Sequence, residues 1–160
     1  MFERVYTMTD YHDGPREGVA DFNGAPHKYR ALFVPFDERD SDTFELSPLT
    51  PAVFALEAEA WAIWCRFEAA CPAVPSASDV PKADWGALPD ERARRRELSA
   101  AITAATAMAL DPRVVCAGKF RARAAAAQLP VPFSQVPLEV EWTLVECDAA
   151  PSNPNTVQLT

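Results

Sequence analysis

Glycine is scarce in this chain. Five glycines stand against fifteen prolines in 160 residues, and a glycine-rich loop that cradles phosphate needs the backbone turns that glycine permits. Such a cradle is therefore hard to build from this sequence. Positive charge is also in deficit, because 15 Lys and Arg against 23 Asp and Glu give a formal charge of -8. That charge repels phosphate backbones and argues against binding nucleic acid or anionic membranes.

Long apolar runs and paired cysteines are missing as well. No stretch of the sequence approaches the roughly 20 apolar residues that a membrane span needs, and the first ten residues lack the apolar core of a secretory signal. The four cysteines stand singly, without a C-x-x-C pair, so we expect reduced thiols and a cytoplasmic location. A composition that is 49% hydrophobic and 24% charged is ordinary for a soluble globular domain.

The dipeptide Asn23-Gly24 gives the clearest local signal. It separates two strand-like segments, Gly18 to Phe22 and Ala25 to Phe36, and Asn-Gly favours a two-residue hairpin turn. In that register Ala20 lies opposite His27. Alternation along the strands then predicts two faces. One carries Ala20, Phe22, His27, Tyr29 and Phe33, and the other carries Val19, Asp21, Lys28 and Arg30.

Two segments show helical periodicity. Thr50 followed by Pro51 predicts the start of a helix, and apolar residues recur every three or four positions from there to Cys71. A second helix is predicted over Asp90 to Leu110, before Asp111-Pro112. In the first helix we expect the apolar stripe to be buried and the charged side chains to face solvent; these are Glu57, Glu59, Arg66 and Glu68.

Strands complete the predicted fold. Alternation and β-propensity indicate further strands at Val5 to Thr9, Thr43 to Leu46, Arg113 to Ala122 and Val136 to Cys147. If the last two pair antiparallel, the basic side of one meets the acidic side of the other. We therefore predict a single α+β domain over residues 1–147, with an antiparallel, strongly twisted sheet of five or six strands packed by two helices. Residues 72–89 are expected to form a proline-rich surface loop and residues 148–160 a flexible tail.

Both histidines lie in one polar stretch, Asp10 to His27. Its candidate ligand-binding residues are Tyr11, His12, Asp13, Arg16 and His27. His12 could act as a base that Asp13 orients, with Arg16 holding an anionic group. The alternative is that Tyr11 to Arg16 is a turn rich in proline, glycine and aspartate, and that His27 is a packed sheet residue.

The sequence gives little support for a metal site or for a catalytic nucleophile. A metal site built from His12, Asp13, Asp21 and His27 would have suitable ligands, but alternation places Asp21 and His27 on opposite faces of the hairpin. The acidic run from Asp37 to Glu45 lacks a glycine and a terminal glutamate at the spacing of an EF-hand loop. No G-x-S-x-G elbow occurs. We expect no metal and no cofactor, and leave open whether the protein is an enzyme.

Trp85 stands alone in the proline-rich segment. It is the candidate interaction residue, either covering the core or exposed as a recognition anchor. The acidic surface and the lack of a catalytic motif favour a non-catalytic binding or protein-interaction module, for example an acidic immunity or regulatory factor. Its partner would be another protein rather than nucleic acid or a membrane. The alternative is a small enzyme or ligand-binding protein with a site on the Asp10 to His27 stretch.

The opening of the chain also carries a resemblance. Tyr11, Asp13-Gly14-Pro15, Asn23-Gly24 and Pro26-His27 form a pattern that resembles the opening of a group of small bacterial proteins. The resemblance extends to the tryptophan-bearing segment Trp61-Ala62-Ile63-Trp64. It implies a bacterial cytoplasmic protein and implies no activity.

Overall fold

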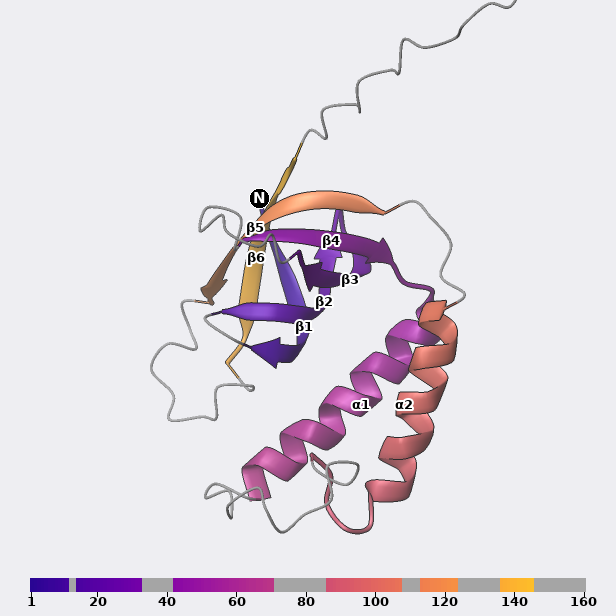
Figure 1. The fold of residues 1–160 in the computed structure, drawn as a ribbon. Helices are drawn as coiled ribbons and strands as arrows, with labels where there is room; N and C mark the ends of the chain where they lie inside the picture. Colours follow the sequence, from indigo (N-terminus) through magenta and orange to yellow (C-terminus); the bar gives the residue numbers. More distant parts are fainter. Residues whose placement is uncertain (12–13, 33–41, 71–85, 108–112, 124–135, 146–160) are drawn as a thin grey trace, which may run out of the picture.

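A computed structural model describes residues 1–11, 14–32, 42–70, 86–107, 113–123 and 136–145 of the chain (Figure 1). These residues form six antiparallel strands and two helices, which confirms the predicted α+β class. In chain order the elements are β1 (Phe2–Tyr11), β2 (Pro15–Phe22), β3 (Ala25–Ala31), β4 (Thr43–Pro48), α1 (Pro51–Ala70), α2 (Arg92–Ala107), β5 (Val114–Ala122) and β6 (Leu138–Leu144).

The sheet closes into a barrel, which corrects the expectation of a sheet that is merely twisted. Each strand pairs with its neighbour in sequence, and β1 also pairs with β6, where Phe2 lies opposite Glu141 and Arg4 opposite Glu139. Register shifts on β1, between Val5 and Thr7 and again after Met8, increase the bend and twist of the strand. Closure follows because this curvature brings the first and last strands together and pairs edges that would otherwise stay open.

The predicted hairpin is confirmed. Ala20 pairs with His27 and Phe22 with Ala25, and Asn23 and Gly24 have φ angles of 54° and 75°. Two successive residues with positive φ are what a type I′ turn requires. The backbone N–H groups of Asn23 and Gly24 donate to the two carboxylate oxygens of Glu3, each at 2.9 Å, so a side chain of β1 holds this turn.

The barrel interior is a packed aromatic core. The ring centroids of Tyr29, Phe44, Phe120 and Trp142 lie 5.4 to 6.1 Å from one another. A Cβ atom at Gly118 would lie 2.6 Å from the Trp142 ring, so this position needs glycine. The Tyr29 hydroxyl donates to the backbone oxygen of Thr7 at 3.1 Å, and burial raises the pKa of Tyr29 above its ordinary value. Aromatic rings thus occupy the interior, where larger barrels hold a ligand.

The two helices lie side by side below the barrel, between β4 and β5 in the chain (Figure 1). On the outer face of the barrel Phe54 of α1 packs edge-on against Tyr6, with 4.9 Å between ring centroids. The second helix packs mainly on α1 and has far fewer contacts with the strands. Ala60, Ile63, Ala87 and Leu98 form the buried cluster of this helix pair. Neither described helix is both long and apolar enough to cross a membrane.

Several predicted boundaries change. The second helix begins at Arg92 instead of Asp90 and is described as far as Ala107, so its predicted end at Leu110 lies outside the described residues. The last two strands do pair antiparallel, with Lys119 opposite Glu141 and Arg121 opposite Glu139, as the charge pattern predicted. Phe33, most of segment 72–89 and the tail 148–160 lie outside the described residues.

Candidate functional site

The predicted site on the Asp10 to His27 stretch is only partly described. Tyr11 is half-exposed at the end of β1 and pairs with Pro15, whereas His27 pairs with Ala20 on the same strand β2. Pro15 and Ala20 are five positions apart on β2, about 16 Å of extended chain. The register therefore places Tyr11 and His27 apart. His12 and Asp13 lie outside the described residues.

Arg16 and His27, two of the predicted site residues, lie on neighbouring strands of the barrel. Arg16 is buried and lies at a register shift between β1 and β2, where Asp10 pairs with Glu17 and Tyr11 with Pro15. His27 packs edge-on against Phe22, at 5.3 Å between ring centroids, and its Nδ1 lies 2.8 Å from the backbone oxygen of Ala25. Asp21 faces outward and accepts a hydrogen bond from the Tyr6 hydroxyl at 3.1 Å. Asp21 and His27 thus lie on opposite faces, as alternation predicted.

Trp85, the candidate interaction residue, lies outside the described residues. The buried Gly86 follows it, with φ at 91°, and a Cβ atom there would lie 2.7 Å from the Trp64 ring. This glycine lets the chain pass close to α1 on its way to the second helix.

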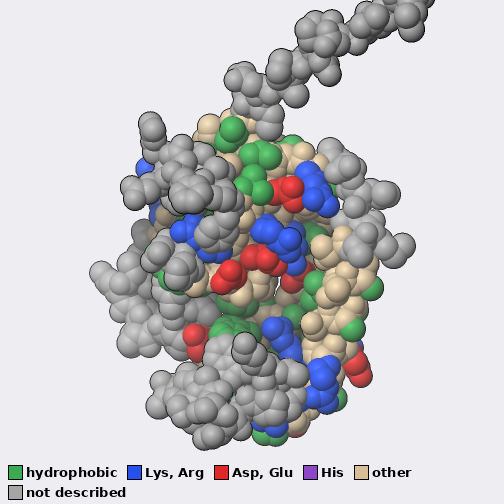
Figure 2. Space-filling view, in the orientation of Figure 1, with side chains coloured by type: hydrophobic (Ala, Val, Ile, Leu, Met, Phe, Trp, Pro, Cys, Tyr) green, Lys and Arg blue, Asp and Glu red, His purple; other side chains and the backbone are tan. Residues whose placement is uncertain are grey.

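A cavity of about 490 Å³ lies where the barrel meets the two helices. Figure 2 shows acidic and basic side chains gathered along this boundary, where the surface is hollowed. Its wall combines the outer faces of β3 and β4, the start of α1, the end of α2 and the start of β5. Among the described residues this wall contains Lys28, Arg30, Glu45, Ser47, Pro48, Leu49, Thr50, Val53, Ala105, Thr106 and Arg113. The volume falls in the range of small-molecule sites.

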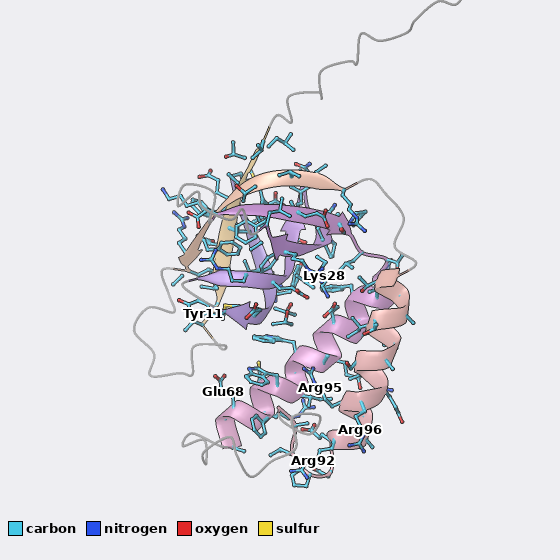
Figure 3. All side chains as sticks on the ribbon, in the orientation of Figure 1. Tyr11, Lys28, Glu68, Arg92, Arg95 and Arg96 are labelled. Carbon is cyan, nitrogen blue, oxygen red and sulfur yellow. The ribbon has the colours of Figure 1, made fainter. Side chains whose placement is uncertain are left out.

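Two basic residues of the wall, Lys28 and Arg30, belong to a chain of alternating charges whose two carboxylates are not among the described residues of the wall. The Lys28 ammonium lies 3.0 Å from a carboxylate oxygen of Glu57 on α1 and 3.2 Å from one of Glu17 on β2. The other Glu17 oxygen accepts a hydrogen bond from Arg30 Nε at 3.2 Å. Glu57 is 4% exposed, so this chain begins in the interior and ends at the surface with Arg30. In Figure 3, Lys28 extends from the barrel toward the start of α1.

The rim of the cavity carries a second ion pair and the end of a helix. Arg113 Nη1 lies 3.1 Å from Glu45 Oε1, and the side chains of Arg113 and Arg30 are 52% and 61% exposed. Thr50 caps α1, because its hydroxyl accepts the N–H of Val53 at 3.3 Å. The amino end of a helix carries partial positive charge, so the cavity has a positive helix end in its wall.

Glu57 is the residue that the sequence analysis placed wrongly. Its polarity assigned it to the solvent-facing side of the first helix, but the structure buries it against Lys28. A buried carboxylate is tolerated when an opposite charge and hydrogen bonds compensate for lost hydration. Alternation did place Lys28 and Arg30 together on one face of β3, opposite Tyr29, and two adjacent basic residues could have indicated that an acidic residue of another element packs against them.

The arginines at the start of α2 serve the helix pair instead. Arg94 forms two hydrogen bonds at 2.7 Å with the carboxylate of Glu59, and Arg95 donates to the backbone oxygen of Ala60 at 3.2 Å. Figure 3 shows Arg92, Arg95 and Arg96 along the helices, away from Lys28. In the part of the chain that the structure describes, no group of three or more His, Cys, Asp or Glu side chains could hold a metal ion.

Comparison with known proteins gives no further guide, because the chain matches no family model, no curated protein and no solved structure.

Proposed function

We propose that this protein is a non-catalytic binding protein that holds a small organic molecule in the cavity between the barrel and the helices. The observation that carries the proposal is the cavity itself, about 490 Å³ in volume. Most ligand sites are concave and mainly apolar, with a few polar groups that orient the ligand. Leu49, Val53 and Ala105 supply apolar wall, and Lys28 and Arg30 supply the polar groups.

Binding is favoured over catalysis by how the charged groups are used. Ser47 is the strand partner of Lys28, and both line the cavity. A serine beside a lysine can serve as nucleophile and base when the amine accepts a proton. Here the Lys28 ammonium donates toward two carboxylates, those of Glu17 and Glu57. That arrangement fixes the lysine as a donor, which suits recognition of a ligand.

A cavity-filling variant tests the proposal. Ala105 lines the cavity, whereas Ala104 is exposed on the same helix, so Ala105→Trp should fill the space and Ala104→Trp should leave it open. A library of small organic molecules is screened by ligand-observed NMR against the unmodified protein, and each hit is retested on both variants. We expect hits that Ala105→Trp abolishes and Ala104→Trp retains. A screen whose hits all survive Ala105→Trp, or that yields none, contradicts the proposal.

A further inference from the structure

The described wall of the cavity is unequal in charge. Three of its side chains are basic, Lys28, Arg30 and Arg113, and one is acidic, Glu45. We propose that the ligand is an aliphatic monocarboxylate, whose carboxylate meets the arginines at the rim and whose apolar body lies along α1 and α2. This inference rests on the proposed function and names the class of molecule that the cavity takes.

The carboxylates that pair with these cations do not remove the preference for an anion. Glu17 pairs with Lys28 and Arg30, Glu57 pairs with Lys28, and neither carboxylate is among the described residues of the wall. A ligand group inside the cavity therefore lies nearer to the cations than to these two carboxylates. Because Coulomb energy falls with distance, the nearer charges dominate the field that the ligand meets.

Arg30 is suited to bind a carboxylate. Its Nε donates to Glu17, and a guanidinium carries four further N–H donors on its two terminal nitrogens. Those terminal nitrogens end a side chain that is 61% exposed at the rim. A planar guanidinium matches a planar carboxylate through two parallel hydrogen bonds, so Arg30 can hold the headgroup while Glu17 keeps the guanidinium in place.

A single negative charge fits the wall better than a double one. Glu45 pairs with Arg113 at 3.1 Å, and this acidic group would repel the second charge of a phosphate monoester. The positive end of α1 adds a fraction of one charge at Thr50. Each of the three cations is also paired with a carboxylate, Glu17, Glu57 or Glu45, so the positive excess is smaller than the wall residues alone give, and one ligand charge is balanced better than two.

The apolar part of the wall indicates which kind of ligand body the cavity suits. Leu49, Val53 and Ala105 are aliphatic, and Pro48 adjoins them at the end of β4. None of these four side chains is aromatic, so the wall offers burial without ring stacking. An unbranched alkyl chain gains from such a surface through burial of each methylene group.

A matched pair of probes tests the inference. Octanoate and octan-1-ol share a chain length and differ in charge, and octyl phosphate adds a dianionic headgroup. We expect isothermal titration at neutral pH to show octanoate binding roughly tenfold more tightly than octan-1-ol, equivalent to about 1.4 kcal/mol, and more tightly than octyl phosphate. Arg30→Gln should remove most of the advantage of octanoate and leave octan-1-ol unchanged. Arg94→Gln, which changes an exposed arginine paired with Glu59, is the control and should alter neither.

The outcomes separate this inference from the proposed function. Equal binding of octanoate and octan-1-ol, abolished for both by Ala105→Trp, overturns the carboxylate and leaves the cavity as a binding site. Tighter binding of octyl phosphate overturns the single charge in the same way. If none of the three probes binds, the ligand class is wrong, and the library screen then decides whether the cavity binds any small molecule.

Discussion

At the scale of single residues, Glu57 is the unusual one. It is a carboxylate only 4% exposed, and its partner Lys28 lies on a different element, at 3.0 Å. Moving an ion out of water costs several kcal/mol unless an opposite charge compensates. Lys28 provides that compensation and is shared with Glu17. The pair therefore both fastens α1 to the barrel and sets the position of a cationic group in the cavity wall.

Replacing this carboxylate should weaken the fold measurably. We expect Glu57→Gln to lower the free energy of unfolding by about 1 to 3 kcal/mol, measured by urea denaturation. The loss stays below that of a fully orphaned buried ion because Lys28 keeps Glu17 as a partner. Glu59→Gln is the control, since Glu59 is an exposed carboxylate on the same helix that pairs with Arg94. Equal losses in the two variants would show that the burial of Glu57 has no energetic role.

At the scale of elements, the turn between β2 and β3 depends on a side chain from β1. Both oxygens of Glu3 accept backbone N–H groups of the turn, those of Asn23 and Gly24. Hydrogen bonds to an ionised acceptor are stronger than neutral ones. The turn is thus held by two devices, its own positive-φ residues and a carboxylate on the neighbouring strand.

Removing the carboxylate should loosen the turn without unfolding the barrel. We expect Glu3→Ala to lower the free energy of unfolding by about 1 kcal/mol and to speed amide hydrogen exchange at Asn23 and Gly24. Glu3→Gln, which keeps one carbonyl acceptor, should give an intermediate effect on both measurements. Unchanged exchange at these two amides in Glu3→Ala would mean that the turn residues suffice alone.

Features that depend on residues close together in the chain could be predicted from the sequence, whereas contacts between distant parts of the chain could not. The Asn23-Gly24 hairpin and its register were predictable because the signal lies in the turn itself. Complementary charges indicated that the last two strands would bring a basic side against an acidic side, but the individual pairs, such as Arg121 with Glu139, come from the structure. Barrel closure was not predictable, since it joins Phe2 to Glu141 from distant parts of the chain. No local pattern announces such a contact.

The cavity shows the same limit. Alternation placed Lys28 and Arg30 together on one face of β3, but their role depends on which helix packs there. The first helix was assigned its buried side from apolar residues alone, which excluded Glu57. The pattern of polar residues within one element cannot show that a residue of opposite charge lies on another element. The wall of the cavity combines residues from strands, helices and a connection.

At the scale of the whole molecule, two buried clusters divide the described structure. One fills the barrel, with Tyr29, Phe44 and Val140 among its members, and the other joins the helices around Leu98. The second helix packs mainly on α1, so its attachment depends on the helix cluster more than on the barrel. The cavity lies between the two units, with part of its wall on each.

This division predicts that the second helix can open while the barrel stays closed. Leu98 is 1% exposed, and a buried Leu→Ala change costs about 2 to 5 kcal/mol. If the helix pair opens as its own unit, Leu98→Ala should speed amide exchange along α2 by about 30-fold or more, while the Tyr29 and Val140 amides change little. Val140→Ala is the matched comparison and should speed exchange in both units, because α1 docks on an intact barrel. Acceleration of the barrel amides by Leu98→Ala to the same extent as those of α2 would show one cooperative unit. Under the expected outcome Ala105 and Thr106 move with α2. Leu98→Ala should therefore also weaken the binding of a ligand in the cavity, although Leu98 does not line that cavity.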